Sequence, residues 1–180
     1  FVDSHDVQTN GTMSHDKTSV AWYWQNEPKT HNNLSVSHPG FAWAARRSAL
    51  PRGLYDRNIT GGGDSTMIPG FTGCYLHVNE ACNQAWREHC RQWCQATYQT
   101  VHGALGYVRG CLLHWAHGTL PNRKYMDRWR YLAENDYDPA TDVEIDPDNR
   151  LLRWTEQARR TKPRMIEQVS GYFAERKEDD

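Results

Sequence analysis

The sequence predicts a mainly α-helical fold, in which a helical hairpin and C-terminal helices follow a long irregular N-terminal arm. Three observations support this prediction. Apolar residues recur at helical spacing from residue 78 onward, chain breakers are dense before residue 72, and the composition is poor in aliphatic residues. Leu, Ile, Val and Phe make up only about 16% of the chain, below the roughly 20% under which chains begin to look disordered.

Aromatic residues compensate for the missing aliphatic ones. The 180 residues include 8 Trp and 9 Tyr, large side chains that bury much area and keep a polar group. Such a composition is more typical of surfaces that contact other proteins than of a large hydrophobic core within one chain. No apolar run is long enough for a transmembrane helix, and the net charge of −1 gives no general case for binding nucleic acid.

Residues 1–72 are expected to form an extended arm that wraps partner subunits. Asn, Asp, Ser, Thr, Gly and Pro dominate this stretch, and a short helix over residues 41–50 is the one regular element expected. So long a segment without regular structure is uncommon inside a compact domain. Breakers recur too often for long elements, at Pro28, Pro39, Pro51, residues 61–63 and Pro69.

Residues 73–120 are expected to form a cysteine-containing helical hairpin. Asn79 is the expected N-cap of its first helix. Gly103 and Gly106 permit a turn, and a second helix is expected over residues 105–115. The first helix is predicted from an apolar stripe at three- and four-residue spacing, formed by Val78, Cys82, Trp86, Cys90, Trp93, Cys94, Thr97 and Val101.

The sequence of residues 121–180 predicts C-terminal helices around an acidic loop. One helix is expected over residues 122–135, and the acidic loop at 136–148 is expected to be solvated. Helix resumes near Asn149, and Pro163 either kinks it or begins another helix capped by Thr161.

The five cysteines lie between residues 74 and 111 and suggest a disulfide. If the hairpin turns near residue 102, Cys94 faces Cys111, and closing that loop would stabilise the chain by about 3 kcal/mol. Cys74, Cys82 and Cys90 are further candidates for pairing. The alternative is that all five are reduced and pack as small apolar residues.

A structural zinc site is a second alternative for the same cluster. Cys90, Cys94, Cys111 and His114 could all face the inside of the hairpin. Three cysteines and one histidine are a ligand set of structural zinc. The preferred prediction for the cysteines is a disulfide, without a metal.

Catalytic motifs are incomplete, so no catalytic residue and no cofactor are expected. The GDSTM stretch at residues 63–67 lacks the last glycine of a nucleophile elbow. The GGGDST stretch at residues 61–66 lacks the lysine of a phosphate-binding loop. The acidic loop lacks the sixth-position glycine of an EF-hand. The sequence therefore predicts a protein that is not an enzyme.

Tryptophans are the expected interface anchors, because binding energy concentrates in such residues. All eight tryptophans are candidates, and the first choices lie in the arm and in the C-terminal helices. The first choices are Trp22, Trp24, Trp43, Trp129 and Trp154, and the further candidates are Trp86, Trp93 and Trp115.

The predicted hairpin, with cysteines on facing helices, resembles the coiled-coil-helix proteins of the mitochondrial intermembrane space. The twin C-x9-C spacing of that family is absent, since 7, 7, 3 and 16 residues separate the cysteines here. Residues 93–98 and 118–121 resemble subunit VIb of cytochrome c oxidase. Residues 67–88 resemble the PDSW-type accessory subunits of respiratory complex I through Ile68, Pro69, Thr72, Cys74, Cys82, Trp86 and Arg87.

The resemblance implies a non-catalytic accessory subunit of a mitochondrial respiratory-chain complex, with complex I as first choice. Such a subunit would stabilise the assembly as a peripheral protein on the intermembrane-space face of the inner membrane. Its partners would be other subunits of a large membrane complex, without nucleic acid. The alternatives are the small zinc protein described above and a secreted disulfide-bonded binding protein, suggested by glycosylation sequons at Asn10, Asn33 and Asn58.

Overall fold

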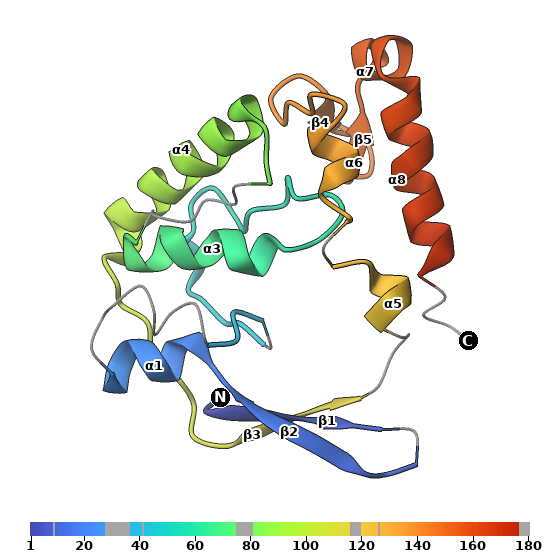
Figure 1. The fold of residues 1–180 in the computed structure, drawn as a ribbon. Coiled ribbons are helices and arrows are strands. Elements are labelled where there is room, and N and C mark those ends of the chain that lie inside the picture. Colours follow the sequence, from blue (N-terminus) through green and yellow to red (C-terminus); the bar gives the residue numbers. More distant parts are fainter. Residues whose placement is uncertain are drawn as a thin grey trace. The chain divides into compact units, whose positions relative to one another are not determined.

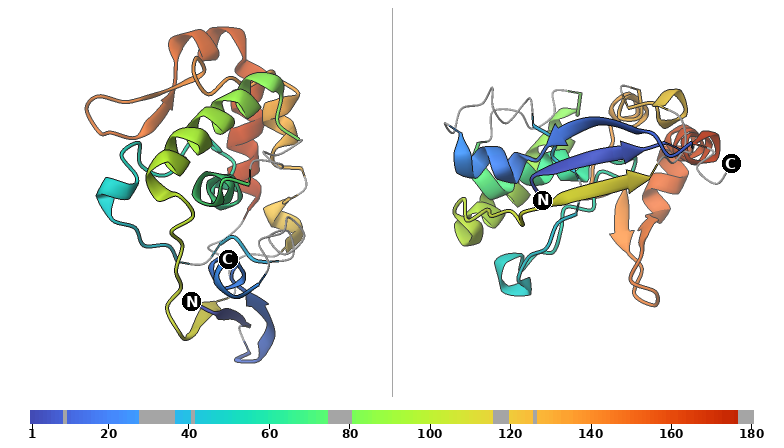
Figure 2. Two further views of the ribbon diagram at one scale, coloured as in Figure 1. Left: turned by 90° about the vertical axis from the view of Figure 1, so that its left-hand side faces the viewer. Right: turned by 90° about the horizontal axis from the view of Figure 1, so that it is seen from below.

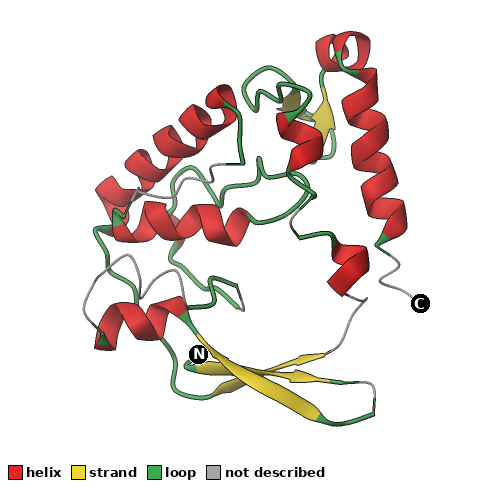
Figure 3. Ribbon diagram, viewed as in Figure 1, coloured by secondary structure: helices red, strands yellow, loops and turns green. Residues whose placement is uncertain are grey.

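The chain has a mixed α/β fold with two small sheets (Figure 1, Figure 3). This computed structural model describes residues 1–8, 10–27, 37–40, 42–74, 81–115, 120–125 and 127–176. The predicted mainly α fold is therefore wrong, both in its irregular arm and in its helical hairpin. The chain divides into two compact units, the first of Phe1–Leu54, Asp64–His77 and Trp93–His117, the second of Tyr55–Gly63, Val78–Gln92 and Gly118–Asp180.

A three-stranded sheet organises the first unit, in the order β2-β1-β3. Its strands are β1 (Asp3–Val7), β2 (Met13–Thr18) and β3 (Cys111–Trp115). β1 pairs antiparallel with β2 and parallel with β3, and Figure 2 shows the three strands side by side. Because β1 and β3 are parallel, a long connection must separate them in the sequence.

A tight turn joins β1 to β2 in the segment that was predicted to be irregular. Gly11 adopts a φ of +81°, and its N–H donates to the carbonyl of Gln8 at 2.9 Å. The Asn10 carboxamide oxygen accepts from the N–H of Thr12 at 3.0 Å. These are ordinary turn contacts for Asn and Gly. Polar residues therefore close a β-hairpin that the polar composition of the segment did not predict.

Helix α1 (Val20–Asn26) follows β2 directly and is capped by Ser19. The Ser19 hydroxyl accepts from the N–H of Trp22 at 3.2 Å and donates to the carbonyl of Phe1 at 2.6 Å. A serine N-cap satisfies a helix N–H that would otherwise lack a partner. In the described part of the predicted short helix, residues 42–50, the 3-10 turn Arg47–Ala49 is the one helical element.

The predicted stripe helix is confirmed from Gln84 to Val101, as α4 (Gln84–Val101), whereas residues 81–83, which the stripe also covered, are not helical. Within α4, five stripe positions are buried, namely Trp86, Cys90, Trp93, Cys94 and Thr97. Asn83 caps the helix, accepting from the N–H of Trp86 at 3.0 Å, while the predicted cap Asn79 lies outside the described residues. Helix α3 (Gly63–Thr72) also forms, inside the predicted arm.

The second arm of the predicted hairpin is not a helix. Residues 104–108 have no regular structure, and residues 111–115 form β3. Three glycines at 103, 106 and 110 weaken helix formation in this stretch. Pairing with β1, about a hundred residues away, gives the segment its hydrogen bonds instead.

The second unit packs around aromatic side chains. Trp86 is fully buried, with its ring edge-on to Tyr137 at a centroid distance of 5.3 Å and to Trp129 at 6.3 Å. Its indole N–H donates to the Asn58 carboxamide oxygen at 2.9 Å. Edge-to-face pairs of this kind stabilise beyond their buried area. Aromatic residues thus supply the core that the few aliphatic residues leave incomplete.

Short elements surround this aromatic core. The helix predicted over residues 122–135 is interrupted, and the region predicted to resume helix near Asn149 begins with a strand that pairs antiparallel with β4. Pro163 begins a helix, as predicted, although Lys162 and not Thr161 stands at its cap position. The elements are α5 (Leu120–Arg123), α6 (Arg130–Ala133), β4 (Val143–Ile145), β5 (Leu152–Trp154), α7 (Glu156–Thr161) and α8 (Pro163–Glu175).

Candidate functional site

One face of the β2-β1-β3 sheet carries exposed apolar side chains. Val7 of β1 pairs with Met13 of β2 and with Trp115 of β3, so these three residues form a row across the sheet. Leu113 lies two residues before Trp115 and therefore points to the same side. Met13, Leu113 and Trp115 are 62%, 50% and 68% exposed, whereas Val7 between them is buried. We call Met13, Leu113 and Trp115 the apolar face.

The outer edge of β3 is uncharged. Its residues, CLLHW, contain no Asp, Glu, Lys or Arg, and β1 is its single neighbour among the described strands. The opposite edge strand, β2, contains the charged residue Lys17. Charged residues on edge strands discourage pairing with other chains. The β3 edge lacks that protection and adjoins the apolar face.

The other face of the same sheet is polar. Asp6 of β1 and His114 of β3 are register partners, and the Asp6 carboxylate lies 2.9 Å from His114 Nδ1. The ammonium of Lys17 lies 3.6 Å from the same carboxylate. Burial alone would raise the pKa of Asp6, but the His114 hydrogen bond and the Lys17 charge outweigh it and lower that pKa.

His38 belongs to the same polar group. Its Nδ1 accepts from the N–H of Gly40 at 3.1 Å. Burial lowers the pKa of His38, and the Lys17 charge adds to this effect against the opposing pull of Asp64 and Asp6. The neutral imidazole is therefore the form that the fold favours, and these contacts serve to fix the sheet to its surroundings.

A second cluster of titratable groups surrounds Tyr55 in the other unit. The Tyr55 hydroxyl lies 3.1 Å from His89 Nδ1 and 3.1 Å from Cys90 Sγ. Burial, followed by the neighbouring Cys90 thiol, raises the pKa of Tyr55. Burial likewise raises the pKa of Cys82. Reactive nucleophiles need the opposite shift, so Tyr55 and Cys82 are suited to packing and hydrogen bonding.

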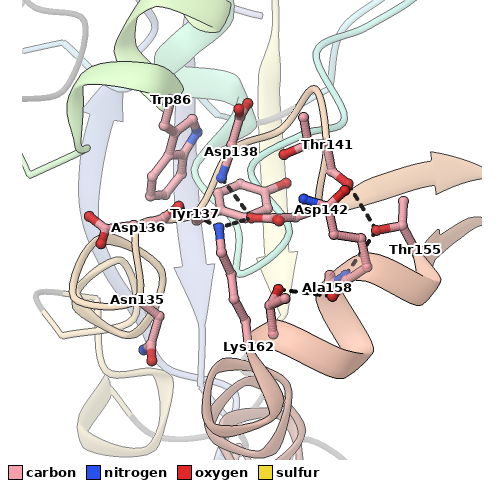
Figure 4. A network of polar contacts seen from close by, with 12 residues as sticks. Trp86, Asn135, Asp136, Tyr137, Asp138, Thr141, Asp142, Thr155, Ala158 and Lys162 are labelled. Atoms are coloured by element: carbon pink, nitrogen blue, oxygen red, sulfur yellow. Dashed lines mark hydrogen bonds and ion pairs between the residues drawn. The ribbon is translucent and has the colours of Figure 1, made fainter.

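A buried ion pair lies within the acidic loop that was predicted to be solvated (Figure 4). Asp142 is 1% exposed, and its carboxylate accepts from Lys162 Nζ at 2.7 Å and from the N–H of Asp138 at 2.8 Å. Lys162 also donates to the carbonyl of Asp136 at 2.7 Å. These hydrogen bonds hold the loop against the start of α8.

None of the five cysteines, all within the described residues, forms a disulfide. Cys94 is buried in α4 and its thiol donates to the carbonyl of Thr66 at 3.3 Å, whereas Cys111 is exposed on β3. Cys82 and Cys90 are buried and Cys74 is half-buried. The predicted pairing of Cys94 with Cys111 depended on the helical hairpin, and that hairpin does not form.

The zinc alternative loses its geometry for the same reason. His114, one of its four ligands, lies on β3 and is hydrogen-bonded to Asp6. In the described ranges no three His, Cys, Asp or Glu side chains come close enough to hold a metal ion.

The five predicted tryptophan anchors contact the chain itself. The Trp24 indole is buried and donates to the carbonyl of Gly103 at 2.7 Å. Trp43 and Trp129 donate to the carbonyls of Pro39 and Gly61, each at 2.9 Å. Trp22 packs edge-on against Tyr23, and Trp154 packs edge-on against Tyr137.

The most exposed tryptophan, Trp115, was not among the first choices of anchor. Trp115 was placed at the end of a helix, where its neighbours would have been different. The glycines at 103, 106 and 110 were the available signal, because such a density argues against a helix and for an extended segment.

The sequons differ in accessibility. Asn58 is buried, and its amide donates to the carbonyl of Gly62 at 3.1 Å. A glycan on Asn58 is therefore incompatible with the folded second unit. Asn10 is exposed at a turn, and Asn33 lies outside the described residues.

No helix in the described part of the chain is long and apolar enough to cross a membrane. No family model, curated protein or solved structure matches the chain. The geometry of its own residues is thus the basis on which a function can be proposed.

Proposed function

We propose that this chain is a non-catalytic binding protein that docks on another protein through the apolar face and the β3 edge. The observation that carries the proposal is the exposure of Met13, Leu113 and Trp115 on one side of a small sheet. Single exposed apolar residues are ordinary, whereas three on one side of a small sheet favour an interaction surface. Tryptophan is also among the residues in which binding energy concentrates.

An extended segment of the partner is the occupant that best fits this site. An edge strand offers main-chain N–H and C=O groups to an added strand, and neighbouring side chains supply specificity. The uncharged β3 edge complements a segment that is itself uncharged and apolar at alternate positions. A partner strand on β3 would cover Leu113 and Trp115 at the same time.

The absence of a catalytic role is part of the same proposal. Burial raises the pKa values of Tyr55 and Cys82, which opposes their use as nucleophiles. The Asp6–His114 pair is engaged with Lys17 and lies on the polar side of the sheet. These contacts support a structural use of the titratable groups.

A respiratory-chain complex remains our proposal for the host, with complex I first and the intermembrane-space face as the location. The support for it is the short resemblance of residues 67–88. The predicted helical hairpin does not form and gives this host no support. Docking is therefore assigned to β3 and the apolar face.

The test is the native mass of the tagged full-length chain in cells that contain its partners. We expect the wild-type chain to migrate with a large assembly. Replacing Met13, Leu113 and Trp115 together by Thr should release it as a monomer, because threonine keeps the strands and removes the apolar surface.

The control is Leu151→Thr, which removes a side chain that is 66% exposed in the other unit. This variant should migrate as the wild type does. A free wild-type monomer, or a triple variant that stays in the assembly, would contradict the proposal. Self-association of the purified chain would identify a second copy as the occupant instead.

A further inference from the structure

A positively charged loop follows Trp43 in the first unit. We call residues 44–54, AARRSALPRGL, the basic loop, because they contain three arginines and no acidic residue. Arg46, Arg47 and Arg52 are all exposed, and among the described residues no ion pair joins any of them to a carboxylate. The whole chain has a net charge of −1, so these charges are a local concentration. Cations clustered in this way attract an anionic partner.

Two successive turns hold the backbone of the basic loop. The 3-10 turn Arg47–Ala49 comes first. In the second turn, the N–H of Gly53 donates to the carbonyl of Leu50 at 2.9 Å, and Gly53 adopts a φ of +71°, which favours glycine. Just before the loop, the Trp43 ring packs against Phe71 of α3 at a centroid distance of 5.4 Å. Little backbone entropy is therefore lost when the loop binds a surface.

Apolar side chains lie among the arginines. Leu54 is 54% exposed, and Pro51 is exposed beside Arg52 in the chain. An anionic bilayer accepts both kinds of side chain, because its phosphates match guanidinium groups and its acyl boundary takes aliphatic groups. Nucleic acid fits less well, because the loop contains no aromatic residue on which a base could stack. An acidic protein surface would match the arginines alone, whereas a bilayer also accounts for the exposed leucine.

We propose that the basic loop binds the surface of membranes that contain anionic phospholipids. Each arginine near such a surface strengthens binding about fivefold, and salt screens this attraction beyond about 8 Å at physiological ionic strength. Three arginines and one leucine therefore give a weak, reversible attachment. The proposal rests on residues 44–54 alone, so it holds or fails independently of docking through the apolar face.

The test is co-sedimentation of the full-length chain with lipid vesicles. Phosphatidylcholine vesicles with about one third phosphatidylserine supply the anionic surface, and vesicles of phosphatidylcholine alone are the reference. We expect the chain to bind the anionic vesicles, less tightly as salt is added, and to bind the neutral vesicles at least about tenfold more weakly. Equal binding to both kinds of vesicle, or binding that salt does not change, would overturn the proposal.

Two double variants separate the basic loop from the net charge of the chain. Arg46→Gln with Arg47→Gln should weaken binding to the anionic vesicles at least about tenfold, because two surface-bound charges are lost. Arg159→Gln with Arg160→Gln removes the same charge from an adjacent, exposed pair in α7. This matched control should bind as the wild type does. An equal loss of binding in both double variants would refute the loop as the lipid site.

Two further measurements identify the surface and the partner. Replacing Met13, Leu113 and Trp115 together by Thr should leave vesicle binding unchanged, because these residues lie outside the basic loop. Loss of vesicle binding in that variant would assign the lipid contact to the apolar face and contradict the proposal. Leu54→Asn should weaken vesicle binding about threefold, because an aliphatic group leaves the acyl boundary. Binding of soluble polyglutamate without binding of anionic vesicles would identify an acidic protein as the partner instead.

Discussion

At the residue scale, His38 is a side chain whose protonation the fold opposes. Lys17, His114, Asp6 and Asp64 all act on its imidazole, and burial dominates, so its pKa is lowered from the ordinary value near 6.5. The unfolded chain therefore takes up a proton at a higher pH than the folded chain does. This contribution to stability is complete above the unfolded pKa and is lost as the pH falls through the folded pKa.

We predict that His38→Gln reduces the loss of stability that the wild-type chain shows on acidification. The comparison is the midpoint of thermal unfolding between about pH 7.5 and pH 5, where histidines titrate. The wild type should lose more than the variant over this range. His102→Gln, which changes a histidine outside the polar face, is the control and should follow the wild type. Equal pH dependence of His38→Gln and wild type would refute this role of burial.

At the element scale, the local sequence pattern was sufficient to predict α4 but not to predict β3. The stripe of α4 appears in the sequence because five buried positions recur at helical spacing. β3 is specified by its pairing with β1, about a hundred residues away, and no local signal encodes that pairing. The strands β1 and β2 were missed because their residues, DSHDV and MSHDKT, are mostly polar.

The candidate site was correspondingly hard to anticipate. Its three side chains come from β2 and β3, so they meet only when both strands pair with β1. Trp115, one of the tryptophans expected to make contacts with partners, lies in this site, and that role stays a prediction. The anchors Trp22, Trp24, Trp43, Trp129 and Trp154 stay predictions.

Two glycines offer a paired test of the elements that they occupy. Gly171 lies inside α8 with open space around it, whereas a Cβ on Gly62 would lie 2.2 Å from the Trp129 ring. Gly171→Ala should stabilise the chain by about 0.5–1 kcal/mol, because alanine is the better helix former. Gly62→Ala should destabilise it by at least about 1 kcal/mol, because it adds a clash at a positive φ. Chemical denaturation measures both, and a stabilising Gly62→Ala would be inconsistent with that clash.

At the scale of the whole molecule, long-range polar contacts replace part of the missing aliphatic core. Asp142 and Lys162, twenty residues apart, join the acidic loop to the start of α8 through a buried carboxylate. Removing one member of a buried pair leaves an uncompensated charge, which costs more than the pair contributes.

We therefore predict that Lys162→Met destabilises the second unit by about 3–5 kcal/mol. The double variant with Asp142→Asn should recover part of this loss, because it removes the buried charge. Arg153→Met, which removes an exposed guanidinium and its ion pairs with Glu144 and Asp146, should change stability by much less, about 1 kcal/mol. Denaturant titration of the three variants separates these cases, and a near-neutral Lys162→Met would argue against a buried pair.

Docking through the apolar face and the β3 edge is the central claim at this scale, and hydrogen exchange of the β3 amides tests it most directly. Exchange is compared between the purified chain and the chain in its native assembly, for the peptide that covers residues 111–115. The account predicts that these amides exchange at least about tenfold more slowly in the assembly, while the exposed hairpin turn between β4 and β5 is unchanged. Equal exchange of the β3 amides in both states would contradict it.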